Sequence, residues 1–128
     1  MLVADLRSDT LTRPTEAMRE EMARAPVGDD VFGEDPTVAR LQQHVADLLG
    51  HEAGLFTPSG TMAGQLAIRE HCGPGQELIA DEMSHVLRAE MGAAAALSGI
   101  TTRSWRADRG ELEPEAVSRL VAPASSPY

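Results

Sequence analysis

Apolar side chains recur every three or four residues in one segment of the chain, from Val38 to Leu49. The apolar positions of this segment are Val38, Leu41, Val45, Leu48 and Leu49. This spacing places them on one face of a helix. Asp35 can cap such a helix, Pro36 suits its first position, and Gly50 suits the position after its end. The pattern therefore predicts an amphipathic helix between Asp35 and Gly50.

Caps and helix breakers predict four further helices. Thr15 is a suitable N-cap for a helix that Pro26 stops, and Gly99 follows an alanine-rich segment. The predicted helices run from Thr15 to about residue 25, from the turn at residues 58–61 to about residue 71, over residues 86–97, and over residues 113–121. Residues 1–14 are expected to be extended and polar.

Three short segments are predicted to be strands: a buried run at residues 53–57, then residues 77–80 and 101–106. Strands that alternate with helices indicate an α/β protein, with a parallel sheet and crossover helices. We expect residues 1–50 to form an arm, an acidic loop and a helix. Residues 51–128 are expected to form the first part of an α/β domain. Three parallel strands leave two open edges, which we interpret as a sign of truncation.

Composition restricts the partners more than the fold. The 128 residues carry a formal charge of -9, with 20 acidic and 11 basic residues, and every basic residue is arginine. This balance argues against nucleic acid or an anionic membrane as a partner. No apolar stretch reaches the ~20 residues of a membrane span. The single cysteine, Cys72, cannot form an internal disulfide, so we expect a cytoplasmic protein.

The turn at residues 58–61 lies between a predicted strand and a predicted helix. The free N–H groups at the start of a helix point to one spot, and the helix dipole favours an anion there. Gly60 lets a ligand approach the backbone closely, and the hydroxyls of Ser59 and Thr61 can add hydrogen bonds. These features suit a phosphate group. Ordinary N-capping by Ser59 is the alternative that the turn alone leaves open.

His85 follows the second predicted strand. Ligands of open α/β sheets bind beyond the carboxyl ends of the strands, so His85 and the turn at residues 58–61 are expected to face one crevice. An imidazole there can stack on a flat ring or transfer protons, and a surface histidine is the alternative. No metal site is predicted, because no two histidines have metal-ligand spacing and the acidic loop at residues 28–35 lacks EF-hand spacing.

Several motifs, in this order, resemble one enzyme family. They are Asp-Leu-Arg-Ser-Asp-Thr at residues 5–10, Gly-Asp-Asp-Val-Phe-Gly-Glu-Asp-Pro-Thr at residues 28–37, Ser-Gly-Thr-Met-Ala at residues 59–63, and His85. The series resembles the low-specificity L-threonine aldolases, within the β-eliminating lyase group of pyridoxal-phosphate enzymes that have the aspartate-aminotransferase fold. The resemblance implies the first part of the large, mostly parallel-sheet domain of a fold-type I enzyme.

The resemblance also implies roles for individual residues. Ser8 matches a serine that helps to hold the substrate carboxylate. Residues 59–61 match the donors to the cofactor phosphate, and His85 matches a histidine that stacks on the pyridine ring and assists proton transfer. Phe32 stands where tyrosine is often found, so any role of a hydroxyl there is lost. The loop at residues 28–35 is expected to contribute to an active site shared between subunits.

The implied activity is cleavage of L-threonine or L-allo-threonine to glycine and an aldehyde, in amino-acid metabolism, by a homotetramer. The family binds pyridoxal 5'-phosphate through a downstream lysine, and this sequence contains no lysine. Arginine cannot replace it, because its guanidinium keeps its proton and is no comparable nucleophile. We therefore expect these 128 residues to be the N-terminal part of such an enzyme, inactive alone.

Two alternatives to threonine cleavage remain open. One is a related chemistry on the same fold, either β-elimination from aromatic or sulfur amino acids or cleavage of other β-hydroxy amino acids such as phenylserine. The other is a short protein that binds phosphate compounds or a full-length partner without catalysis.

Overall fold

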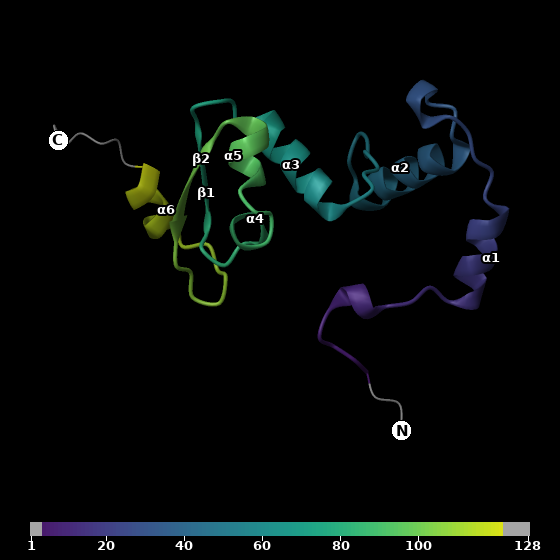
Figure 1. Cartoon of the computed structure of the whole chain (residues 1–128), viewed down its shortest axis with the longest axis horizontal. Helices are drawn as coiled ribbons and strands as arrows, with labels where there is room; N and C mark the ends of the chain where they lie inside the picture. The colour runs from purple at the N-terminus through teal and green to yellow at the C-terminus, as the bar shows by residue number, and fades with distance from the viewer. Residues whose placement is uncertain (1–3, 122–128) are drawn as a thin grey trace. The chain divides into compact units, whose positions relative to one another are not determined.

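The computed structural model describes residues 4–121, which divide into two units. The first unit comprises Met1–Phe56 and the second comprises Thr57–Tyr128. Figure 1 labels the helices and strands of both units. The helices and the small parallel sheet make this an α/β protein.

The first unit contains helices but no strand within its described residues. Its elements are the 3-10 turn η1 (Asp9–Leu11), helix α1 (Glu16–Arg24), the 3-10 turn η2 (Asp30–Phe32) and helix α2 (Pro36–Leu49). Thr15 caps α1, as predicted. The arm differs from the expected extended form, because the Ser8 side chain accepts a hydrogen bond from the Thr10 N–H and caps a short turn.

Helix α2 confirms the prediction made from its caps. Asp35 Oδ1 accepts hydrogen bonds of 2.9 Å from the N–H groups of both Thr37 and Val38. Gly50 follows the last turn with a φ of 70°, in the left-handed region that glycine adopts without strain. Of the predicted apolar face, Leu48 remains 71% exposed, and Ala46 is the residue of α2 that is buried.

The predicted strand at residues 53–57 is not formed. Its backbone packs on α2 instead of pairing with a strand. A Cβ added to Gly54 would lie 2.8 Å from the carbonyl oxygen of Gln42, and the Phe56 N–H donates to Gln42 Oε1 at 2.8 Å. The prediction was wrong because a helix side chain takes the hydrogen bond that a neighbouring strand would have taken.

The second unit contains the sheet and four helices in its described part. Their order is α3 (Gly60–His71), β1 (Glu77–Asp81), α4 (His85–Arg88), α5 (Ala93–Ser98), β2 (Thr101–Trp105) and α6 (Pro114–Val121). The strands are parallel, with Glu77 opposite Thr101 and Asp81 opposite Trp105. Both strands were predicted, but the described sheet has two strands rather than the expected three.

The predicted helix over residues 86–97 is divided into α4 and α5. Between them, Met91 and Gly92 have φ values of 50° and 76°. Two successive residues in the left-handed region end a right-handed helix and turn the chain. Alanine-rich composition alone did not reveal this break.

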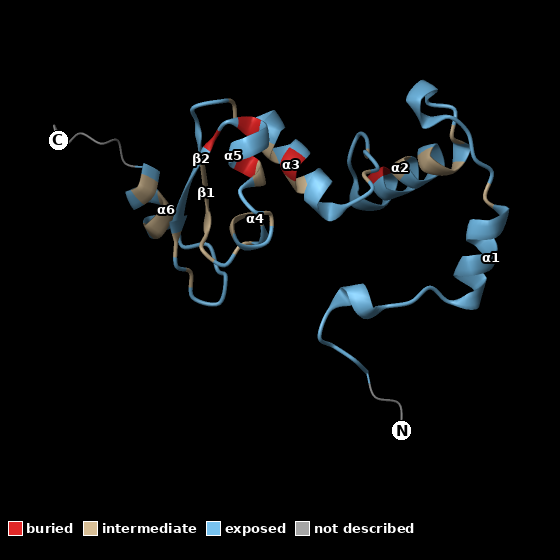
Figure 2. Ribbon diagram, in the orientation of Figure 1, coloured by how far each residue is buried: buried red, intermediate tan, exposed pale blue. Residues whose placement is uncertain are grey.

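The core of the second unit lies where α5 meets α3 and β2. Ala94 and Ile100 are its buried apolar residues, and Gln65 and Ser98 are buried as well. Figure 2 shows the buried positions of this unit in red, on α3 and α5 and beside the sheet. Arg103 links β2 to its two neighbours: it donates to Glu77 Oε1 of β1 at 2.9 Å and to the Leu120 carbonyl of α6 at 2.6 Å.

The lengths of the helices bear on membrane insertion. The longest described helix is α2, with 14 residues. Within residues 4–121, no helix is both long and apolar enough to cross a bilayer.

Candidate functional site

The N-terminus of α3 is the first component of the candidate site. Ser59 has an extended backbone with φ of -153°. Its Oγ accepts a hydrogen bond of 3.1 Å from the Met62 N–H, and its carbonyl accepts one of 3.1 Å from the Ala63 N–H. The N–H groups of Gly60 and Thr61 come before these in the first turn, where a helix supplies no partner of its own. They remain available to a bound anion.

The space in front of this helix start is open. A Cβ added to Gly60 would meet no atom within 4 Å. The helix has 12 residues, so its dipole places positive potential at this end. Open space, free N–H groups and the hydroxyl of Thr61 suit an anion such as phosphate.

His85 is the second component, at the first position of α4. Its Nδ1 lies 2.8 Å from Glu90 Oε1, and the other oxygen, Glu90 Oε2, accepts a hydrogen bond of 2.6 Å from Gln65 Nε2. The Glu90 side chain is 6% exposed, whereas the His85 side chain is 69% exposed. The buried carboxylate of Glu90 therefore links the exposed imidazole of His85 to Gln65 of α3. Gln65 lies about one and a half helical turns after Gly60.

The hydrogen bonds to Glu90 favour its ionised form. The amide of Gln65, and then the imidazole of His85, hold the pKa of the Glu90 carboxyl below its ordinary value, against the opposing effect of burial. An ionised carboxylate only accepts hydrogen bonds. The network therefore has a defined polarity, with Gln65 and His85 donating to Glu90.

A cavity lies beyond the carboxyl ends of β1 and β2. It is lined by Asp81, Glu82, Met83, Ser84, Arg106, Ala107, Arg109 and Gly110. Asp81 secures its walls, because its Oδ1 accepts from the Met83 N–H and its Oδ2 from the Ala107 N–H, both at 2.8 Å. His85 directly follows this wall in the chain, at the end of the sheet where α/β proteins bind ligands.

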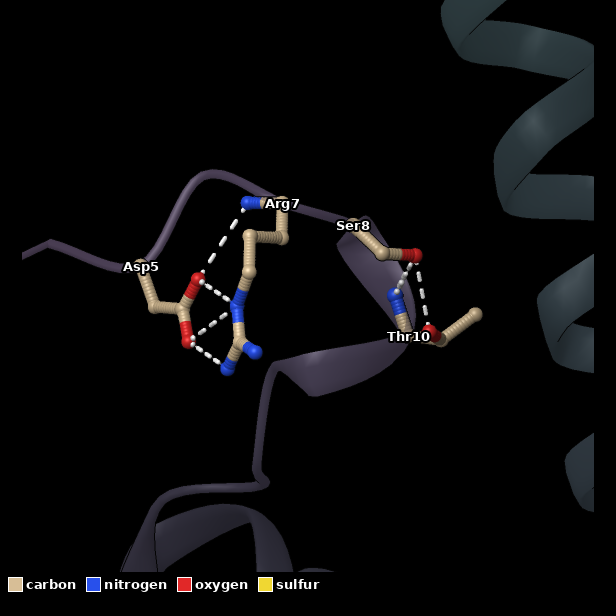
Figure 3. A network of polar contacts seen from close by, with 4 residues as sticks. All are labelled: Asp5, Arg7, Ser8 and Thr10. Carbon is tan, nitrogen blue, oxygen red and sulfur yellow. Dashed lines mark hydrogen bonds and ion pairs between the residues drawn. The ribbon is translucent and has the colours of Figure 1, made fainter.

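Ser8 lies in the first unit, in a small polar network (Figure 3). Its Oγ accepts from the Thr10 N–H at 3.2 Å and lies 2.7 Å from Thr10 Oγ1. Beside it, Arg7 Nε donates to Asp5 Oδ1 at 2.8 Å. These side-chain hydrogen bonds hold the pKa of Asp5 below and that of Arg7 above their ordinary values. The arm presents an exposed hydroxyl whose orientation is set locally.

Phe32 also lies in the first unit, at the end of η2, and is 77% exposed. Two acidic residues of the same loop accept hydrogen bonds from the backbone. Asp29 caps η2 by accepting from the Val31 N–H at 2.9 Å. Asp35 caps α2 and also accepts from the Gly28 N–H at 3.0 Å. Among the residues that the structure describes, no three His, Cys, Asp or Glu side chains gather as a metal site requires.

Sequence reasoning missed Glu90 and Gln65. Each is a polar residue flanked by small or apolar neighbours, and that was the available signal. Glu90 interrupts the alanine-rich run after His85, and Gln65 stands between Gly64 and Leu66 on α3. Buried polar side chains need partners, so two such positions indicate a contact across the core.

Comparison with known proteins identifies the family of the chain. The sequence model of the β-eliminating lyase family matches residues 5–128. The low specificity L-threonine aldolase of Escherichia coli (strain K12) is 52% identical over 96 residues, covering 75% of this chain and 29% of that protein. Low-specificity L-threonine aldolase 1 of Arabidopsis thaliana is 41% identical over 123 residues, 94% of this chain and 34% of that protein.

A third relative is the low specificity L-threonine aldolase of Saccharomyces cerevisiae, 47% identical over 95 residues, which cover 73% of this chain and 24% of that protein. The chain spans about a third or less of the length of these relatives. The family match nevertheless extends over nearly the whole sequence given. The chain belongs to the β-eliminating lyase family.

Proposed function

We propose that this chain is part of a pyridoxal-phosphate-dependent aldolase that cleaves L-threonine and L-allo-threonine to glycine and acetaldehyde. The observation that carries the proposal is helix α3, which has a free N-terminus and whose Gln65 is linked through Glu90 to the exposed His85. It stands in a chain that is 52% identical, over 96 residues, to a threonine aldolase of Escherichia coli. In this proposal the site residues of the described chain bind and orient, and the remaining parts come from elsewhere in the protein.

The residues at the start of α3 fit the phosphate of the cofactor. Gly60 and Thr61 offer backbone N–H groups, and Thr61 adds a hydroxyl. No atom lies within 4 Å of a Cβ added at Gly60, so a ligand can approach the backbone there. The Ser59 Oγ already accepts a hydrogen bond from the Met62 N–H, so the contribution of Ser59 is to fix the shape of the turn.

His85 fits the face of a flat ring. One edge of its imidazole is fixed at Nδ1 by Glu90, while most of the side chain is exposed. A ring held at one edge can stack on another ring and exchange a proton at its free nitrogen. When bound, pyridoxal phosphate supplies the sink for the electron pair that is released as the substrate Cα–Cβ bond breaks.

The first unit supplies two further candidates. Ser8 presents a hydroxyl for the substrate carboxylate, and Phe32 presents an aromatic ring without a hydroxyl. Because these 128 residues contain no lysine, the covalent link to the cofactor has to come from outside them. The chain by itself is therefore proposed to be inactive.

The assembly is proposed to be a homotetramer with shared active sites, in the cytoplasm. The apolar surface that α2 leaves open supports an assembly, because its Leu48 and Leu49 are 71% and 64% exposed. Exposed leucines on one helix are typical of surfaces that become buried in an assembly.

Product analysis tests the proposed function. The complete gene product is incubated with pyridoxal phosphate and L-threonine, and the products are identified. Glycine and acetaldehyde in equal amounts support the aldolase. A keto acid and ammonia, from threonine or from an aromatic or sulfur amino acid, indicate β-elimination instead and overturn the proposal.

A further inference from the structure

The Glu90 carboxylate occupies an unusual position in the second unit. It belongs to neither α4 nor α5, and the next residue, Met91, has a φ of 50°. A residue other than glycine is strained in this left-handed conformation. This strained turn places Glu90 Oε1 within hydrogen-bond distance of His85 and Glu90 Oε2 within hydrogen-bond distance of Gln65.

We propose that Glu90 is a positioning residue for His85, which fixes the imidazole with its proton on Nδ1 and leaves Nε2 as a free acceptor. The argument begins with donors and acceptors. The carboxylate of Glu90 accepts at both oxygens, so the partner at 2.8 Å must donate, and a neutral imidazole donates from one nitrogen only. The proton on Nδ1 leaves the lone pair on Nε2.

Gln65 fixes the carboxylate in turn. Its Nε2 donates to Glu90 Oε2 at 2.6 Å, and its own Oε1 is buried without a partner among residues 4–121. Gln65 is 6% exposed, so its amide has little freedom to turn away. The carboxylate is thereby held between a helix in the core and a ring at the surface.

The consequence for the reaction rests on the proposed function. An Nε2 lone pair can accept the proton of the substrate β-hydroxyl, and the resulting imidazolium is stabilised by the Glu90 carboxylate 2.8 Å from its other nitrogen. A carboxylate that orients a histidine and selects its tautomer is a recurrent device in enzymes. Glu90 itself touches neither the substrate nor the cofactor in this account.

Nuclear magnetic resonance of the tautomer tests the inference without measuring activity. The complete gene product is labelled with 15N-histidine, and the signals of His85 are assigned by their loss in His85→Asn. We expect the neutral ring of His85 to carry its proton on Nδ1 in the unmodified protein. A neutral ring protonated on Nε2 overturns the inference, whatever the variants do.

Three variants separate positioning from bulk structure. Glu90→Met keeps the size and removes the acceptor, so the proton should move to Nε2 in most molecules. Glu90→Gln should keep the Nδ1 proton, because its carbonyl can still accept from His85. Its amide can then donate to Gln65 Oε1 once the Gln65 amide rotates in place by half a turn, which exchanges its nitrogen and oxygen without moving the side chain out of the core. Glu70→Met, at an exposed position of α3, removes a carboxylate that makes no hydrogen bond to His85 and should leave the tautomer unchanged.

Kinetics of the same variants add a second readout. Glu90→Met should lower kcat by about tenfold or more with KM within about twofold, and Glu90→Gln should recover most of the loss. Equal losses in Glu90→Met and Glu90→Gln would contradict a role in selecting the tautomer. If the tautomer behaves as stated but threonine is not cleaved, the proposed function fails and Glu90 still positions His85. If threonine is cleaved and the proton is on Nε2, the proposed function stands and the inference about Glu90 fails.

Discussion

The carboxylate of Asp35 accepts a hydrogen bond of 3.0 Å from the backbone N–H of Gly28. The same side chain caps α2, so one residue closes the acidic loop onto the helix that follows it. A second hydrogen bond, of 2.6 Å, also joins the loop to the helix: the Thr37 hydroxyl donates it to the carbonyl of Pro26. The motif at residues 28–37 is thus a folded loop in which the carboxylates of Asp29 and Asp35 accept hydrogen bonds from backbone N–H groups.

Gly28 is required by close approach within this loop. A Cβ at this position would lie 2.3 Å from the carbonyl oxygen of Glu34, which is backbone and cannot turn aside. We expect Gly28→Ala to lower the free energy of unfolding by about 1–3 kcal/mol, the usual cost of overpacking. Urea denaturation measures it. Gly73→Ala is the control, because its Cβ would lie 3.6 Å from the flexible Gln76 side chain and should have little effect.

The pKa of Asp35 makes the stability of this loop depend on pH. The N–H groups of Val38 and Gly28 hold the pKa of the carboxyl below its ordinary value. Because the folded state favours the ionised form, the contribution is complete above the pKa of the unfolded chain and is lost as the pH falls through the folded value. Thermal unfolding of the protein and of Asp35→Asn should differ at neutral pH and converge in acid. A difference that persists unchanged in acid would contradict this origin.

Gly64 lies inside α3, where glycine weakens a helix. The nearest atom to an added Cβ is Glu90 Oε1 at 3.9 Å, an ordinary contact distance. Gly64→Ala should therefore raise the free energy of unfolding by roughly 0.5–1 kcal/mol. The tautomer of His85 should stay the same in this variant, since the Glu90 network is not displaced. A loss of stability would show that the α3 surface is more tightly packed than described.

Ser59 allows capping to be separated from anion binding. Ser59→Asp should keep the N-cap and the stability of α3, but its charge should repel a phosphate at the same helix start. We expect the affinity for pyridoxal phosphate to fall by about tenfold or more in a titration followed by absorbance. Ser59→Asn is the matched control, a neutral cap of similar size, and should bind close to normally. Equal affinity in both variants would place the phosphate elsewhere.

The predictable parts of the fold were those set by local chemistry. Asp35 and Gly50 mark the ends of α2 because capping and the left-handed region depend on the residues themselves. The two described strands followed from their alternation with helices. The start of α3 at Ser59 was predictable for the same reason as α2.

The parts that failed depend on contacts distant in sequence. Nothing within residues 53–57 signals that Gln42 takes the Phe56 N–H and prevents a strand. The break at Met91 places a side chain other than glycine at positive φ, which helix propensity does not anticipate. The Glu90–Gln65 contact spans 25 residues of sequence, so the candidate histidine could be predicted but its support could not.

The absorption spectrum of the complete gene product with pyridoxal phosphate tests the central claim most directly. The account predicts that the protein binds the cofactor with a new band near the visible edge, and that glycine or threonine shifts this band. Ser59→Asp should need much more cofactor to reach the same band. A complete gene product that gives no band, or a band indifferent to both amino acids, would contradict the claim that this chain forms the cofactor-facing part of a threonine aldolase.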